Sequence, residues 1–172
     1  MAIFGGDEIS WQSIDFTALA GGGGLASIAP ADRDPCRSWL LRHGYQVVTL
    51  DGAEGVAVVH GQLSRWLRFE ELYGHRFDGD LDALRDGFFD LEVPLTGGVV
   101  LELLGVDRLW LRERDWTKGL LQIACETSAY NMAIGRRFFS ICVLAPDSSV
   151  VGEAFGSQVM PRCWSGDFGA AG

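Results

Sequence analysis

The sequence predicts an α/β domain with a small parallel β-sheet flanked by helices. Short apolar runs typical of buried strands alternate with stretches in which apolar residues recur at helical spacing, and turn-forming residues separate them. The chain has 172 residues, 48% of them hydrophobic, which is enough to bury the core of one domain. Strands and helices that alternate through short links favour parallel strands and right-handed crossovers.

The N-terminal residues 1–44 are expected to add an extra strand and helix to this sheet. The segment ISWQSIDFTALA (9–20) fits either a strand or a short helix, and four glycines separate it from the apolar strand LASIA (25–29). Asp34 is placed to cap the helix that follows, and Pro35 stands at its first position. This strand and helix lead directly into the more regular part of the chain.

The central residues 45–147 have the clearest pattern, and we treat them as the main domain. The expected elements are a strand at 45–50, a helix at 54–68, a loop at 69–80, a helix at 81–91, a strand at 99–104, a mixed stretch at 105–116, a helix at 117–134 and a strand at 138–145. The strand VVLELL (99–104) is apolar almost throughout, as expected for a strand buried on both faces. The C-terminal tail, 148–172, has only a weak strand signal at 150–155.

Charge and composition exclude several classes of function. A formal net charge of −9 and a pI near 4.7 oppose binding to nucleic-acid phosphates and favour a basic protein as the partner. No run of eighteen apolar residues is present to span a membrane, and the N-terminus lacks the basic start of a secretory signal. A cytoplasmic location is therefore expected, in which the four scattered cysteines are buried thiols.

The sequence has no recognisable catalytic or metal-binding motif. It contains no GxSxG, no HExxH and no Walker loop, and its three histidines are dispersed. We therefore expect no catalytic residues, no metal ligands and no cofactor, and we expect that the protein is not an enzyme. The oligomeric state stays open.

Residues 78–92, DGDLDALRDGFFDLE, place a concentration of negative charge on a predicted helix. Six carboxylates and one cation, Arg85, give this stretch a net charge of −5. Asp82, Asp86 and Asp90 recur every four residues on a face other than the apolar one. Like charges at this spacing repel by about 0.2–0.5 kcal/mol per pair, so such a ridge favours a positive partner. The alternative is a solvated helix face, whose first-turn acids favour the helix dipole.

The residues around this helix, and the order of the elements, resemble the barstar family of intracellular inhibitors of the ribonuclease barnase. In that family a Tyr-Gly loop precedes a helix that begins Asx-Leu-Asp-Ala-Leu-x-Asp. Here Tyr73-Gly74 precedes DLDALRD at 80–86, and strands VVLELL and FFSICVLA follow at similar distances. The resemblance covers about 100 of the 172 residues and implies a barstar-like fold for the central domain.

The resemblance implies that this helix and the loop before it plug the active site of a ribonuclease. Asp82 and Asp86 would stand in for substrate phosphates, with Asp86 as the strongest contact. Such carboxylates form charge-assisted hydrogen bonds with the arginines and histidines of a nuclease site. The expected partner-binding residues are Asp82, Asp86, Arg85, Tyr73, Leu72, Asp78 and Asp90.

The sequence also departs from the family pattern, which bears on the identity of the target. Arg85 stands where the family has a tryptophan, Leu72 stands where the inhibitor has an aromatic residue, and the loop is about four residues longer. A carboxylate late in the family's third helix aligns near Asn131, and the nearest acid is Glu126. The predicted partner is therefore a ribonuclease or a nuclease toxin. The alternative is an acidic adaptor or interaction protein that binds a non-nuclease basic partner, or that binds another toxin in an immunity or antitoxin role.

Overall fold

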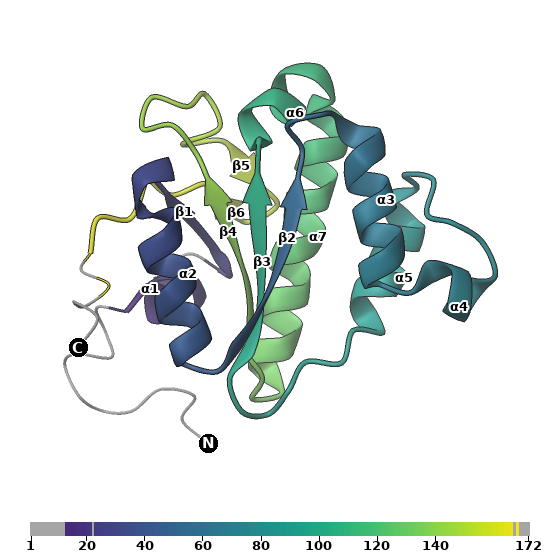
Figure 1. Cartoon of the computed structure of the whole chain (residues 1–172), viewed down its shortest axis with the longest axis horizontal. Helices are drawn as coiled ribbons and strands as arrows, with labels where there is room; N and C mark the ends of the chain where they lie inside the picture. The colour runs from purple at the N-terminus through teal and green to yellow at the C-terminus, as the bar shows by residue number, and fades with distance from the viewer. Residues whose placement is uncertain (1–12, 22, 167, 169–172) are drawn as a thin grey trace.

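The computed structural model describes residues 13–21, 23–166 and 168, and it has an α/β architecture (Figure 1). Four strands form one parallel sheet in the order β1-β4-β3-β2. Their bounds are Leu25–Ile28 for β1, Tyr45–Asp51 for β2, Gly98–Leu104 for β3 and Phe138–Val143 for β4. The predicted fold class, a small parallel sheet flanked by helices, is confirmed.

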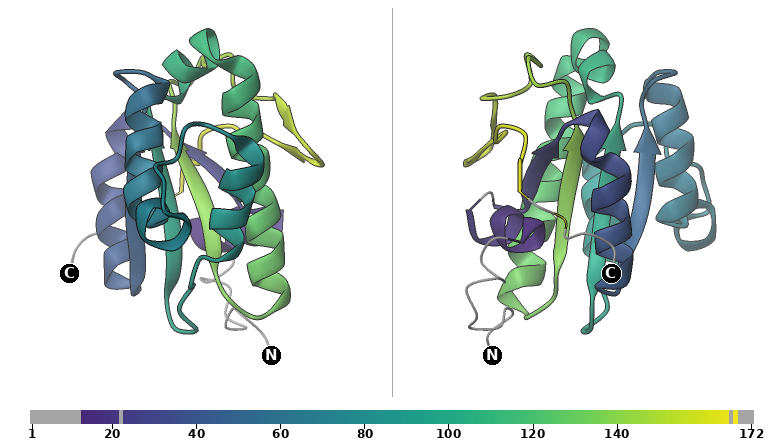
Figure 2. Two further views of the ribbon diagram at one scale, coloured as in Figure 1. Left: turned by 90° about the vertical axis from the view of Figure 1, so that its right-hand side faces the viewer. Right: turned by 60° about the vertical axis from the view of Figure 1, so that its left-hand side comes forward.

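Helices cover both faces of the sheet (Figures 1 and 2). They are α1 (Ile14–Phe16), α2 (Arg33–Arg42), α3 (Val56–Trp66), α4 (Phe69–Tyr73), α5 (Leu81–Phe89), α6 (Val106–Arg112) and α7 (Arg114–Ala133). Helix α2 lies on one face, and α3, α5 and α7 lie on the other. A π-helical turn at Thr17–Gly21 and a 3-10 turn at Pro30–Asp32 precede β1 and α2 respectively. Within the described residues, no helix is long and apolar enough to cross a membrane.

The N-terminal strand enlarges the sheet at one edge, where β1 pairs with β4 in parallel. Strands β1 and β2 are parallel, as expected, but they lie at opposite edges of the sheet. Helix α2 therefore carries the chain across the whole sheet, and Figure 1 shows this crossover to be right-handed. Part of the ambiguous segment 9–20 forms α1 and the following π-helical turn, and residues 9–12 lie outside the described part.

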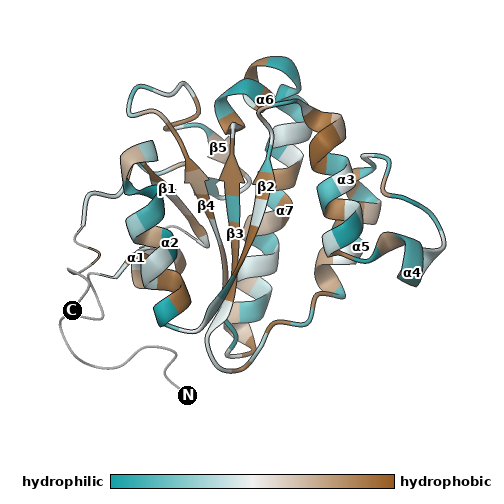
Figure 3. Ribbon diagram, viewed as in Figure 1, coloured by the Kyte–Doolittle hydropathy of each residue, from teal (hydrophilic) through white to brown (hydrophobic). Residues whose placement is uncertain are grey.

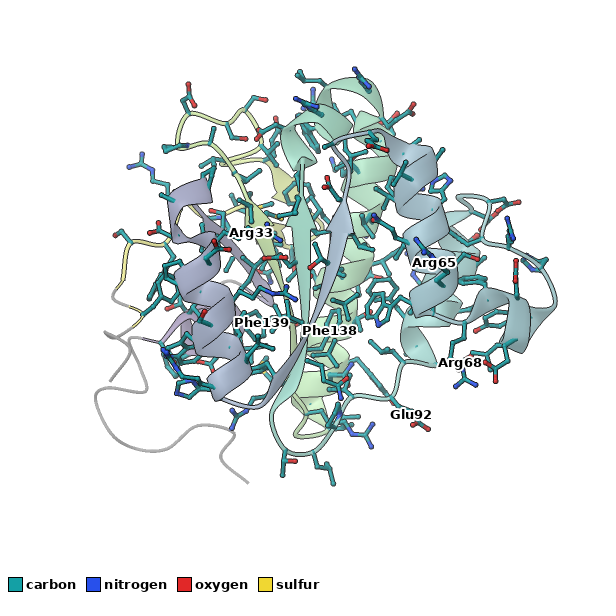
Figure 4. All side chains as sticks on the ribbon, viewed as in Figure 1. Arg33, Arg65, Arg68, Glu92, Phe138 and Phe139 are labelled. Atoms are coloured by element: carbon teal, nitrogen blue, oxygen red, sulfur yellow. The ribbon has the colours of Figure 1, made fainter. Side chains whose placement is uncertain are left out.

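The sheet separates two clusters of buried side chains. Successive residues of a strand point to opposite faces, and in β4 Phe138 belongs to the cluster under α3, α5 and α7 while Phe139 belongs to the cluster under α2 (Figure 4). Apolar colour is concentrated on the strands in Figure 3. The tail contributes as well: Val150, Phe155 and Met160 are buried in the first cluster. Of the weak strand signal at 150–155, only Ala154–Phe155 (β5) forms a strand, paired with Gln158–Val159 (β6).

Two sequence predictions about helices were wrong. The predicted loop 69–80 begins with a short helix, α4, because Arg68 adopts a left-handed conformation (φ 55°) that turns the chain and allows Phe69 to be buried. Asp34 does not cap α2, because a 3-10 turn starts the helix early and places Asp32 at the capping position. The mixed stretch 105–116 forms α6 and the start of α7.

Candidate functional site

The acidic helix α5 is fixed at its start and along its inner face. Asp80 caps the helix, since its Oδ1 accepts hydrogen bonds from the backbone N–H groups of Asp82 (2.8 Å) and Ala83 (2.9 Å). Leu84 and Phe88 are buried in the core between α5 and the sheet. The helix is therefore a rigid support for the side chains on its outer face.

The outer face of α5 carries the carboxylates that the sequence singled out. Asp82, Asp86 and Asp90 are all exposed, and 93% of the Asp82 side chain is accessible. Among the described residues, the Asp86 carboxylate forms neither a hydrogen bond nor an ion pair. A carboxylate in this state is fully available to a second molecule.

Arg85 turns toward the acids of its own chain. Its Nη1 lies 3.0 Å from Asp82 Oδ1, and its Nε lies 3.2 Å from Glu126 Oε2 on α7. Gln122 Nε2 donates a further hydrogen bond to Glu126 Oε1 at 3.0 Å. The cation therefore has two acidic partners, and these three charged groups together stay net negative.

Tyr73 of α4 lies against the end of α5. Its hydroxyl donates a hydrogen bond to Asp90 Oδ2 at 2.7 Å, which together with partial burial and the nearby charges of Asp90 and Asp86 raises the pKa of Tyr73 to about 12. Asp90 is the C-terminal cap residue of α5, where the helix dipole disfavours negative charge. The phenol offsets part of that cost, and Tyr73 stays 36% exposed beside Asp86 and Asp90.

The loop between Tyr73 and α5 is anchored by aromatic packing. Phe77 is buried, and its backbone N–H donates to Ser64 Oγ at 3.1 Å. Trp116 Nε1 donates to the carbonyl of Gly79 at 3.0 Å. The His60 ring packs between Phe77 and Trp116, with centroid distances of 5.2 and 4.8 Å, and burial lowers its pKa. The longer loop is thus attached to the domain.

The other residues that the sequence analysis singled out do not contribute to the exposed acidic face of α5. Leu72 is 52% exposed on α4 and belongs to neither core cluster. Asp78 is exposed in the loop, where its Oδ1 accepts from the backbone N–H of Asp80 at 3.3 Å. Asn131 is 3% exposed and donates to the Thr127 carbonyl at 2.9 Å. It therefore cannot contact a partner in place of the carboxylate that the barstar family has late in its third helix.

Sequence reasoning missed two aromatic residues on the same side of the molecule. Phe89 of α5 is 58% exposed and Tyr130 of α7 is 46% exposed, and their ring centroids lie 5.2 Å apart. A signal was present in the sequence, because Phe88 and Phe89 are consecutive and a helix turns about 100° per residue. Only one of them could face the core.

A second charged group lies inside the fold, between α2 and the sheet. Glu102 of β3 is 4% exposed. Arg33 donates to both of its carboxylate oxygens at 3.1 Å, Arg37 donates at 3.3 Å and Thr49 donates at 2.7 Å. Burial alone would raise the pKa of Glu102, but the hydrogen bonds from Arg33 and Thr49 and the charges of both arginines lower it below its ordinary 4.5.

Other potential sites are weaker. A shallow hollow of about 520 Å³ between α3 and α4 is lined by charged side chains, but Arg68 pairs there with Glu71 and Arg76 with Glu70. Within the described part of the chain, no three His, Cys, Asp or Glu side chains are placed to hold a metal ion. The outer face of α5 is therefore the candidate site.

Comparison with models of known protein families, with characterised proteins and with solved structures gives no significant match.

Proposed function

We propose that this chain is a barstar-like protein that inhibits a ribonuclease by inserting α5, with the loop before it, into the enzyme's active site. The main support is Asp86, an exposed carboxylate without an ion-pair partner among the described residues, on a helix that is capped and packed. Asp82 lies one turn earlier on the same face. The inhibitor would act without turnover and without a cofactor, in the cytoplasm of the producing cell.

The physical basis is complementarity of charge. A nuclease site gathers arginine, lysine and histidine to bind phosphate, and rigidly held carboxylates can take the place of those phosphates. Because α5 is already ordered, little conformational entropy is lost when it binds. The net charge of −9 would also speed the encounter with a basic enzyme.

Arg85 does not oppose this proposal, although it stands where the barstar family has a tryptophan. It is held by Asp82 and Glu126, at 3.0 and 3.2 Å, so its charge is largely compensated before any partner arrives. Tyr73 and Arg85 would flank the entering carboxylates and adjust specificity.

The test is titration of the purified chain into barnase-type ribonucleases and into nuclease toxins encoded near its own gene. We expect one-to-one loss of nuclease activity and an association rate that falls steeply with salt. Asp86→Ala should weaken binding by about 2–5 kcal/mol, which is at least about 30-fold. Asp147→Ala, which removes an exposed acid from the segment that follows β4, away from α5 in Figure 1, is the matched control and should bind normally.

Untouched nuclease activity at stoichiometric excess would refute inhibition. If a basic protein that is not a nuclease instead binds through Asp82 and Asp86, the alternative function, that of an acidic adaptor or immunity protein, is supported. Binding that survives Asp82→Ala and Asp86→Ala together would exclude the α5 surface altogether.

A further inference from the structure

Phe89 and Tyr130 form an aromatic pair on the surface, and the fold does not use it as core. The two rings are tilted by 52° with centroids 5.2 Å apart, and neither residue belongs to the buried clusters on the two faces of the sheet. About half of each side chain stays exposed to solvent. Ile134, one turn beyond Tyr130, is also 47% exposed and extends the apolar surface.

The position of this pair is fixed relative to the acidic residues. Helices α5 and α7 lie side by side (Figure 2, left). The Arg85–Glu126 ion pair joins them, and the Phe89–Tyr130 contact joins them one turn further along. Asp86 precedes Phe89 by three residues and Glu126 precedes Tyr130 by four, and side chains at these spacings are neighbours on one helix face.

This arrangement selects a particular kind of side chain. Aromatic faces attract cations, and nearby carboxylates can pair with the same cation. A guanidinium group satisfies both at once, because it stacks on a ring and donates hydrogen bonds in its plane. The apolar rings also require an apolar neighbour, since burying them against purely polar groups would gain little.

We propose that Phe89 and Tyr130 form a second contact region of the α5 surface, which receives an arginine and an adjacent apolar side chain of the partner protein. This proposal rests on the proposed function, in which Asp82 and Asp86 meet the catalytic cations of a ribonuclease. The second region then contacts the rim of the enzyme's cleft, outside the catalytic residues. It selects a target whose rim carries arginine beside an apolar group.

The first experiment measures binding kinetics with the ribonuclease that the wild-type chain inhibits. Phe89→Ala and Tyr130→Ala should each raise the dissociation rate about tenfold or more and leave the salt dependence of the association rate unchanged. The control is Leu111→Ala, which truncates a 79% exposed residue of α6 and should change the rate less than about twofold. Circular dichroism of each variant checks that it is folded.

The second experiment does not depend on nuclease inhibition. Two short peptides of equal charge are titrated into the chain, one alternating arginine with leucine and the other alternating lysine with glycine. We expect the arginine–leucine peptide to shift the NMR signals of the Phe89 and Tyr130 rings at concentrations several-fold lower than its counterpart. Phe89→Ala should remove that preference, and Leu111→Ala should keep it.

The outcomes separate the two proposals. If Asp86→Ala weakens binding but the aromatic variants match wild type, the second contact region is refuted and inhibition stands. If no ribonuclease is inhibited, the proposed function fails, and the peptide titration alone decides this inference. Equal response to both peptides refutes it. A dimer of the chain that Phe89→Ala dissociates also refutes it, because the occupant would then be a second copy.

Discussion

Glu102 in the sheet and Asp86 on α5 are two carboxylates in opposite surroundings. Glu102 is 4% exposed and is held by Arg33, Arg37 and Thr49. Asp86 is exposed, and no ion pair or hydrogen bond within the described residues occupies it. A buried charge must find its partners inside the fold, whereas an exposed charge on a rigid helix can keep its hydrogen-bonding capacity for another molecule. The first carboxylate therefore has its hydrogen-bonding capacity used inside the domain, and the second is available for binding.

Removal of one cation from the buried group should give the largest effect on stability. Arg33→Met keeps an apolar stem but leaves Glu102 with fewer partners, and we expect unfolding free energy to fall by about 3 kcal/mol. Arg65→Met is the control, since Arg65 lies on the outer surface of α3 (Figure 4) and its loss should cost less than about 0.5 kcal/mol. Urea unfolding followed by circular dichroism measures both. Equal stability of the two variants would show that the buried group is not a stabilising element.

The acid limb of the stability curve tests the same group by titration. The pKa of Glu102 is lowered in the folded state, so its contribution is present above the ordinary value of 4.5 and is lost as pH falls through the folded value. We expect wild type to lose stability in this range more steeply than Glu102→Gln, which cannot titrate there. Parallel curves for the two proteins would contradict a lowered pKa for Glu102.

The cap of α5 should have a smaller effect on stability. Asp80→Ala removes the acceptor of two backbone N–H groups, at 2.8 and 2.9 Å, and should lower the unfolding free energy by about 1 kcal/mol. Asp80→Asn is the matched control, because asparagine caps helices about as well as aspartate. If both variants are equally destabilised, the charge of Asp80 matters more than its capping geometry.

Arg85 offers an exposed counterpart to Arg33. Its side chain is 40% exposed, so the ion pairs with Asp82 and Glu126 are weakened by solvent, and Arg85→Met should cost less than about 1 kcal/mol. The same variant makes the α5 surface more negative and should speed association with a basic partner at low salt. Stopped-flow association kinetics, with Arg65→Met as the control for lost positive charge, measures this. Slower association would mean that a favourable contact of Arg85 with the partner outweighs the repulsion of its positive charge.

The contrast between the two carboxylates also shows what the sequence could predict. The acidic helix was predicted at 81–91 and observed at Leu81–Phe89, because its cap, its apolar spacing and its charges are all local. Glu102 was read only as part of an apolar strand, since its partners Arg33 and Arg37 stand 69 and 65 residues away in the chain. The α4 helix follows Arg68, whose left-handed conformation is one that non-glycine residues rarely adopt. The sequence of residues 69–73 therefore did not predict a helix there.

The smallest predicted effect concerns the hydrogen bond between Tyr73 and Asp90, which lies at the edge of the exposed acidic surface. The bond raises the pKa of Tyr73 to about 12, so its contribution to stability is present below the ordinary value of 10 and is lost as pH rises toward 12. Because both groups are exposed, Tyr73→Phe should lower the unfolding free energy at neutral pH by only a few tenths of a kcal/mol, within about 0.5. A pH titration is the more sensitive measurement. The difference in ultraviolet absorbance between wild type and Tyr73→Phe, followed as pH rises, reports the ionisation of Tyr73 alone. In an Asp90→Asn background its pKa should return toward 10. If the pKa of Tyr73 is unchanged in that background, the charge of Asp86, rather than the hydrogen bond to Asp90, is what raises it.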